Sequence, residues 1–228
     1  MLQHLPPLPM IPGGWKQQPF AVGDRRLELI LPGAPDQLLD DPDVIEANQR
    51  DDYMPYWSYL WPAAPPFAEV LAQAPWPIGV DVLDLGSGIG MTGLALLVRG
   101  DRVTFSDYDV QSLLVCRHNA VRNAFDDPET LLLDWRQPLD RQFPVITGCE
   151  VTYEARNHAP LVALLQRMLA PGGVAWIADP GRFHAPAFYR LAGEAGFDVQ
   201  VLDRSLTIQP GPLSNEFQIM QLRPVDEA

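Results

Sequence analysis

The residues best suited to chemistry lie in a glycine-rich loop between a predicted strand and a predicted helix. Residues 82–90 read VLDLGSGIG. Glycines let the backbone approach a ligand closely, beside the positive end of the following helix. The dinucleotide fingerprint would place Gly or Ala at position 91, where this chain has Met91. Asp84 also precedes the first glycine, and a carboxylate suits an ammonium group better than a pyrophosphate.

A nucleoside with an ammonium-bearing tail fits this loop best. S-adenosylmethionine is such a ligand, because its methionine end carries the ammonium group. We therefore predict that S-adenosylmethionine is the cofactor. The loop residues expected to bind it are Asp84, Gly86, Ser87 and Gly88.

Asp107 ends the second predicted strand, about 20 residues past the glycines, where a carboxylate can accept both ribose hydroxyls. Tyr108 follows it and is assigned to the same site. The alternative is a helix N-cap for the segment that begins near Gln111, and Asp109 fits that alternative better than Asp107 does.

Two further strand ends carry candidate residues. Asp134 and Trp135 follow the third strand, where a carboxylate can bind the adenine amino group and an indole can pack on the purine. A loop acid beside a core tryptophan is the alternative. The fourth strand reaches Gly148, assigned to the cofactor site. Glu150 and Tyr153 then leave the sheet where an acceptor would meet the cofactor, unless they belong to an ordinary strand-to-helix loop.

The elements that must position these residues alternate along the chain. Such a βαβ rhythm predicts a doubly wound, Rossmann-like α/β fold with a mostly parallel seven-stranded sheet. The last two strands have no convincing helix between them, which predicts an antiparallel strand at the sheet edge. We expect an N-terminal extension over 1–60, with a hairpin strand at 26–31 and a helix at 40–48, and a cofactor domain over 61–228. Its predicted strands are 80–85, 103–106, 130–133, 145–149, 174–178, 199–202 and 217–222, and its helices are 67–74, 91–98, 111–119, 159–169 and 184–195.

Composition excludes several classes of protein. The 228 residues are 47% hydrophobic with a net charge of −13, which allows a sizeable core and disfavours nucleic-acid binding. No run approaches the roughly 18 apolar residues of a membrane helix, and no signal peptide is recognisable. Cys116 and Cys149 lie in apolar contexts, so we expect free thiols and a cytoplasmic protein. His118, His158 and His184 lack metal-ligand spacing, so no metal is expected.

The chain resembles the class I, seven-strand methyltransferases, and within them the group that methylates protein lysines. Residues 55–62, PYWSYLWP, resemble the group's segment before the domain, whose second tryptophan (Trp61 here) lines the cofactor pocket. Glu150 and Tyr153 resemble its acid-x-x-aromatic motif. Asp-Pro-Gly-Arg at 179–182, with Asn119 and Asn123, resembles the branch that methylates the electron-transfer flavoprotein β subunit. The resemblance covers roughly residues 53–190.

The resemblance implies methyl transfer from S-adenosylmethionine to a lysine of a protein substrate, with Glu150 and Tyr153 as catalytic residues. Tyr56, Trp61 and Tyr153 are candidates for an aromatic pocket around the amine, whereas Trp57 is expected in the core. One alternative is a small-molecule N-methyltransferase acting on a small amine. Another is a nicotinamide-dependent dehydrogenase or a non-catalytic Rossmann binder, against which Met91 and Asp84 argue. The sequence is compatible with a monomer.

Overall fold

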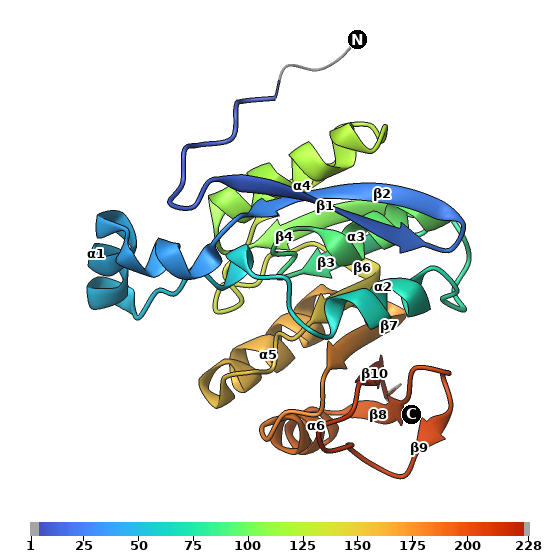
Figure 1. The fold of residues 1–228 in the computed structure, drawn as a ribbon. Helices are drawn as coiled ribbons and strands as arrows, with labels where there is room; N and C mark the ends of the chain where they lie inside the picture. The colour runs from blue at the N-terminus through green and yellow to red at the C-terminus, as the bar shows by residue number, and fades with distance from the viewer. Residues whose placement is uncertain (1–4, 226–228) are drawn as a thin grey trace.

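A computed structural model describes residues 5–225 and shows a doubly wound α/β domain with a hairpin on one side (Figure 1). In the described residues the main sheet has eight strands in the order β5-β4-β3-β6-β7-β10-β8-β9. Strands β5, β4, β3, β6 and β7 are parallel. The strands are β3 (Asp81–Leu85), β4 (Arg102–Asp107), β5 (Glu129–Leu132), β6 (Phe143–Cys149), β7 (Leu169–Asp179), β8 (Phe197–Leu202), β9 (Ile208–Gln209) and β10 (Gln218–Pro224).

The predicted Rossmann-like fold is confirmed, with two corrections at one end of the sheet. The antiparallel strand β10 lies between β7 and β8, not at the edge. Met220 pairs with Ile177 on one side and Val201 on the other, and its side chain is fully buried, so the strand belongs to the core. The edge is instead the two-residue strand β9, which is too short for the sequence pattern to reveal.

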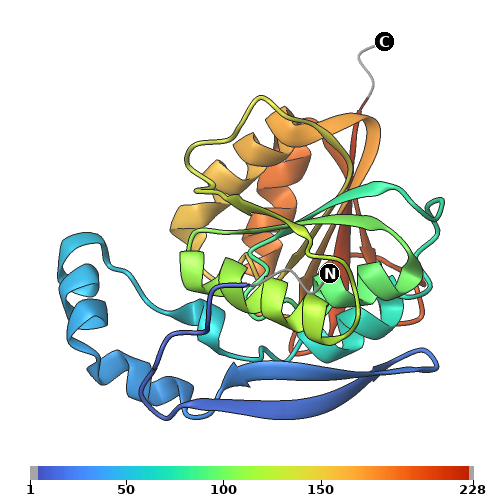
Figure 2. The same cartoon turned by 90° about the horizontal axis from the view of Figure 1, so that it is seen from above.

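Helices cover both faces of the sheet (Figures 1 and 2). Each face has its own hydrophobic cluster. The helix predicted at 159–169 ends at Met168, because β7 already begins at Leu169, before the Pro-Gly-Gly segment. On one face lie α2 (Ala64–Leu71), α3 (Met91–Arg99) and α4 (Val110–Arg122), and on the other α5 (His158–Met168) and α6 (Ala185–Glu194).

The N-terminal segment begins with the expected hairpin, β1 (Trp15–Val22) and β2 (Arg25–Pro32), which lies on α4. Asn119 of α4 binds it: Oδ1 accepts from the Ile30 amide at 2.6 Å, and Nδ2 donates to the Ile30 carbonyl at 2.9 Å and to the Ile89 carbonyl at 2.8 Å. Asn123 makes the equivalent pair of bonds to Glu28. These amides therefore join the hairpin to the domain as an added strand would.

Beyond the hairpin, the chain forms a 3-10 helix (Pro35–Asp40) and then α1 (Pro42–Asp51), which projects from the domain and buries none of its residues (Figure 2). Two more 3-10 helices are Tyr56–Ser58 and Ala155–Asn157. The hairpin's buried leucines share a cluster with the domain, and we propose that residues 1–60 act as a cap on it. Residues 1–4 of the predicted extension and 226–228 of the predicted cofactor domain lie outside the described residues. Within 5–225, each helix is too short or too polar to cross a membrane.

Replacing Asn119 by Ala tests how the hairpin is held. Because Asn119 is fully buried, its removal leaves the Ile30 amide and two carbonyls without partners, and we expect the free energy of unfolding to fall by about 2–3 kcal/mol. Urea denaturation measures the change. Gln17→Ala, which removes an exposed contact to Arg122, is the matched control and should have little effect. Equal stability of the two variants would contradict this account.

Candidate active site

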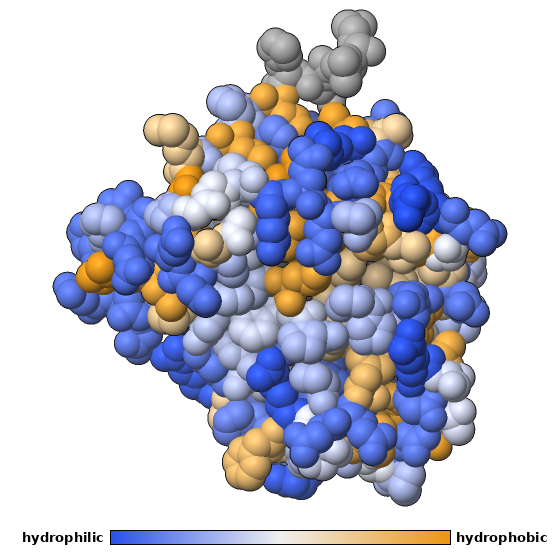
Figure 3. Space-filling model, in the orientation of Figure 1, coloured by the Kyte–Doolittle hydropathy of each residue, from blue (hydrophilic) through white to orange (hydrophobic). Residues whose placement is uncertain are grey.

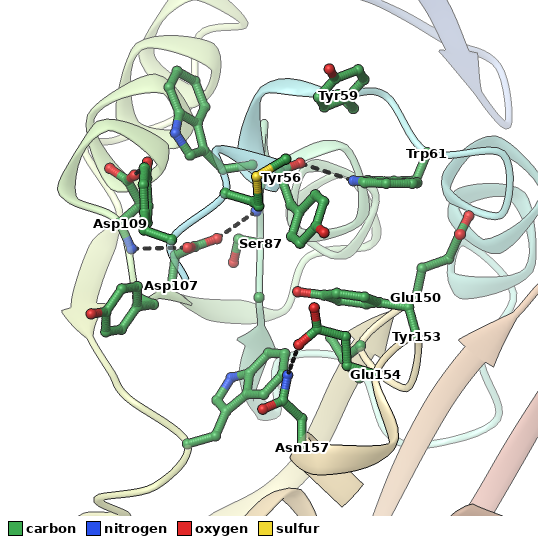
Figure 4. Close-up of a pocket in the computed structure, with 18 of the residues that line it drawn as sticks. Tyr56, Tyr59, Trp61, Ser87, Asp107, Asp109, Glu150, Tyr153, Glu154 and Asn157 are labelled. Atoms are coloured by element: carbon green, nitrogen blue, oxygen red, sulfur yellow. Dashed lines mark hydrogen bonds between the residues drawn. The ribbon is translucent and has the colours of Figure 1, made fainter. Parts of the chain in front are cut away.

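A cavity of about 530 Å³ opens at the carboxyl ends of β3, β4 and β6. This is the end of an open α/β sheet at which ligands bind. Its volume is in the range of small-molecule sites. Figure 4 shows side chains from the segment before α2, the strand ends and the loop after β6 converging on it. The cavity therefore gathers most of the residues that the sequence singled out.

The glycine-rich loop forms one side of this cavity. Gly86 and Gly88 have φ values of +64° and +54°, which favour glycine. A Cβ on Gly86 would lie 3.0 Å from Val151 Cγ1 and 3.2 Å from the Trp135 ring. The Ser87 hydroxyl donates to the Asp84 carbonyl at 2.8 Å, which fixes the turn. Gly86, Ser87 and Gly88, predicted to bind the cofactor, all line the cavity.

The Asp84 side chain is not part of the cavity lining, and its predicted contact with an ammonium group stays a prediction. It is 1% exposed and accepts hydrogen bonds from the hydroxyls of Thr92 at 3.0 Å and Thr147 at 3.0 Å. Burial raises its pKa to about 6, against the lowering effect of these donors. Gly148, which pairs with Leu85 in the sheet, is not part of the lining either. Asp84 supports the loop from beneath, with Thr92 between it and the cavity.

Asp107 ends β4, where the sequence placed it, and its side chain lines the cavity. Its Oδ2 accepts from the Gly88 amide at 2.9 Å and from the Ser112 hydroxyl at 2.8 Å, and its Oδ1 accepts from the Asp109 amide at 3.0 Å. Burial raises the pKa of this carboxyl. Asp109 is the N-cap of α4, the role that the sequence favoured for it, and its side chain accepts from the Gln111 amide at 2.7 Å.

The remaining predicted cofactor residues lie together beside Asp107. Trp135 and Tyr108 line the cavity, and the Tyr108 hydroxyl donates to Asp51 at 2.9 Å. Asp134 also lines it, but its carboxylate pairs with Arg136 at 2.8 Å, which lowers the pKa of Asp134. An adenine contact would have to share that carboxylate with the guanidinium.

Residues 49–54 at the end of α1 also line the cavity, and sequence analysis assigned them no role. They are joined to the opposite rim by polar contacts, among them the Tyr53 hydroxyl to Asp109 and Arg156 to Asp52 at 3.2 Å. No motif marks these residues. The one available signal was the acidic and aromatic Asp51-Asp52-Tyr53 directly before the PYWSYLWP segment.

Four aromatic side chains form another side of the cavity (Figure 4). We call them the aromatic wall: Tyr56, Tyr59, Trp61 and Tyr153. The Trp61 and Tyr153 rings are stacked, with centroids 6.4 Å apart and planes 12° apart. Tyr56 meets Tyr153 edge-on at 5.0 Å, and its carbonyl accepts from Trp61 Nε1 at 2.9 Å. The ring centres of Tyr59 and Trp61 lie 5.6 Å apart. Trp57, expected in the core, is buried in the hydrophobic cluster and also touches the cavity.

The two predicted catalytic residues differ in their surroundings. The Tyr153 hydroxyl points into the cavity, and burial raises its pKa above the usual value, so the phenol stays protonated (Figure 4). Glu150 also touches the cavity, and each of its carboxylate oxygens has a hydrogen-bond partner. Oε1 accepts from the Ala63 amide at 2.7 Å, and Oε2 pairs with Arg182. These two partners fix the direction of the carboxylate, and Oε1 keeps capacity for a second donor, so the catalytic role of Glu150 stays a prediction.

Solved structures of methyltransferases share this fold. A TehB-like S-adenosylmethionine-dependent methyltransferase from Corynebacterium glutamicum superposes with a TM-score of 0.58 at 19% identity, covering 79% of this chain and 96% of that one. A glycopeptide N-methyltransferase complexed with S-adenosylmethionine gives a TM-score of 0.56 at 17% identity, covering 69% and 92%. These likenesses concern the fold.

The chain belongs to the lysine methyltransferase family, whose model matches residues 60–183. The family is one of methyltransferases. A ribosomal protein L11 methyltransferase from Shewanella pealeana is 35% identical over 41% of this chain and 31% of its own length. A cypemycin N-terminal methyltransferase from a Streptomyces species is 32% identical over 69% and 63%. The chain spans about a third of the length of the first curated relatives it matches.

Replacing Asp107 by Asn tests the cofactor site. The variant keeps the side-chain shape but turns one acceptor oxygen into a donor facing either Gly88 or Asp109, and it removes the charge offered to the ribose. We expect S-adenosylhomocysteine to bind at least about tenfold more weakly by calorimetry, since a charged hydrogen bond contributes about 1.5–3 kcal/mol. Asp127→Asn, in an ion pair with Arg117 outside the cavity, is the control. Unchanged affinity in Asp107→Asn, or binding of NAD alone by the unmodified protein, would contradict the assignment.

Proposed function

We propose that the protein transfers a methyl group from S-adenosylmethionine to a lysine side chain of another protein. The observation that carries this proposal is that the glycine-rich loop and the aromatic wall border the same cavity. The glycine-rich loop suits a nucleoside with an amino-acid tail, and the aromatic wall suits a long aliphatic amine. A lysine side chain can enter such a site while its backbone stays outside.

The residues fit the proposed cofactor. Asp107 has acceptor capacity for a ribose, Trp135 offers an indole face for a purine, and the loop at 86–88 leaves room for the tail. When bound, S-adenosylmethionine supplies a methyl group already activated on a sulfonium. The protein's task is then to hold the amine in line with that methyl and to keep water out, which can lower the barrier by several kcal/mol.

The aromatic wall suits the amine in both its protonation states. The rings can attract the incoming ammonium by cation–π contact. A lysine must then lose its proton, since its usual pKa is about 10.4, and an apolar surrounding lowers that pKa. The Tyr153 phenol keeps its own proton, so its oxygen can accept a hydrogen bond from the amine and orient the nitrogen lone pair. The amine's proton leaves to solvent during entry.

Charge around the cavity favours a cationic acceptor. Six carboxylates besides Glu150, which is already paired with Arg182, and three guanidinium groups belong to the lining: Asp51, Asp52, Asp107, Asp109, Asp134 and Glu154 against Arg50, Arg136 and Arg156. Figure 3 shows that the projecting α1 beside it is mostly hydrophilic. Its exposed surface includes Asp43, Glu46 and Asp51, with Arg50 as its basic residue. Such a rim would attract a basic protein segment.

The relatives support an amine acceptor on a polypeptide. One is named for ribosomal protein L11 and another for the N-terminus of cypemycin, so an N-terminal amine is the second candidate acceptor. The aromatic wall favours lysine, because its four-carbon stem can lie along the rings of Tyr56, Trp61 and Tyr153.

Incubating the purified protein with radiolabelled S-adenosylmethionine and a lysate of the source organism tests the proposal. We expect label in protein, and mass spectrometry should place the added methyl groups on lysine side chains. The Asp107→Asn variant, at equal concentration, should label far less because it binds the cofactor poorly. Label confined to small metabolites, or methyl groups found only on N-terminal amines, would contradict the lysine proposal.

A further inference from the structure

A buried ion pair behind the aromatic wall joins two loops that are far apart in sequence. Glu150 follows β6 and Arg182 follows β7. Arg182 Nε donates to Glu150 Oε2 at 3.1 Å, and Nη2 donates to the same oxygen. The Glu150 side chain is 1% exposed and that of Arg182 is 34% exposed. A buried carboxylate requires such a partner, because desolvation without one is costly.

The second oxygen of Glu150 binds the segment that carries Tyr56, Tyr59 and Trp61 of the aromatic wall. Glu150 Oε1 accepts from the amide of Ala63, two residues after Trp61, at 2.7 Å. The Arg182 guanidinium itself lies 5.4 Å from the centre of the Trp61 ring. Trp61 therefore contacts Arg182 directly and is also tied to it through Glu150 and Ala63, while its ring stacks on Tyr153.

Both loops are rigidly held around this contact. Asp179 Oδ1 accepts from the amides of Gly181 and Arg182, each at 2.7 Å, and its Oδ2 accepts from the Thr152 hydroxyl at 2.9 Å. Glu150 has a φ of +54°, a region that a residue with a side chain rarely adopts. Such backbone strain persists where the surroundings over-determine the conformation. The geometry is thus built to present the Glu150 carboxylate inward.

We propose that Arg182 is a positioning residue for the acceptor amine. It acts through Glu150 and through its contact with Trp61, and it sets the orientation of the Trp61–Tyr153 pair against which the amine lies. A stacked aromatic pair alone tolerates many offsets, whereas two Arg182 donors that converge on Glu150 Oε2, with Ala63 on Oε1, restrict how the segment after Trp61 can sit. This inference rests on the proposed function for its catalytic consequence, but its structural consequence can be measured without any reaction.

The catalytic test measures kcat of the Arg182→Ala variant without and with free guanidinium. Removing the side chain leaves Glu150 without its cation, and we expect kcat for protein methylation to fall by about 100-fold through misplacement of the amine. Binding of S-adenosylhomocysteine should weaken far less than kcat falls, because Arg182 is outside the cavity lining and reaches it only through Trp61 and Glu150. Because the Arg182 site is partly exposed, free guanidinium should reach Glu150 and restore much of the lost kcat.

Fluorine NMR of protein labelled with 5-fluorotryptophan gives a readout that needs no turnover. The Trp61 resonance, assigned by its disappearance in Trp61→Phe, should shift in Arg182→Ala and return when guanidinium is added. Arg204→Ala removes an exposed arginine whose partner, Glu69, lies outside the cavity, and it should change neither kcat nor this resonance. Arg182→Lys keeps a cation beside Glu150, so this variant should fold even if Arg182→Ala does not. The Trp61 resonance should also shift in Arg182→Lys, because lysine cannot make the two-donor contact.

An unmoved Trp61 resonance in both Arg182 variants would overturn the proposal, as would a loss of kcat that guanidinium does not restore. Absence of protein methylation by the unmodified enzyme is a separate failure. It would remove the proposed function, while the Trp61 resonance would still decide whether Arg182 orders the aromatic wall.

Discussion

Parallel pairing of β3 with β4 and β6 is the constraint on which the site depends. Leu85 pairs with Ser106 on one side and with Gly148 on the other, so the three strands end at one level. The residues that follow these pairs, Gly86, Asp107 and Glu150, therefore reach the same cavity. Asp107 then accepts from the Gly88 amide, which couples the glycine-rich loop to the end of β4. A shift of one residue in either pairing would reverse the side chains and separate these groups.

The cavity is completed by a segment that the sheet does not contain. Residues 49–61 contribute much of its lining. Their position is fixed by the buried Trp57 and, near α1, which buries none of its residues, by polar contacts. Glu150 holds the Ala63 amide, and Tyr53 and Tyr108 bind acids across the rim. A buried ion pair such as Glu150 with Arg182 contributes little net stability, since desolvation offsets its attraction, but it can favour one arrangement over others. We infer that the Glu150–Arg182 pair holds the aromatic wall in one orientation.

Local sequence rules predicted the parallel strands and the glycine-rich loop well, because hydrophobic runs and positive-φ glycines carry their own signal. They predicted the cavity positions of Asp107, Trp135, Trp61 and Tyr153 because residues at the carboxyl ends of parallel strands, or in a recognisable motif, converge there. Asp84 was assigned to the ligand from its type and its place before the first glycine, and these did not reveal the buried hydroxyl partners that the structure gives it. The Glu150–Arg182 contact and the role of residues 49–54 depend on loop packing between distant segments, which single-sequence patterns do not encode.

The central claim is that the cofactor site and the aromatic wall form one reaction centre. A crystal structure with S-adenosylhomocysteine bound tests it most directly. The account predicts that the sulfur faces the Trp61–Tyr153 pair and that the ribose hydroxyls lie on Asp107. A sulfur that points away from the aromatic wall, or a ligand bound outside this cavity, would contradict it.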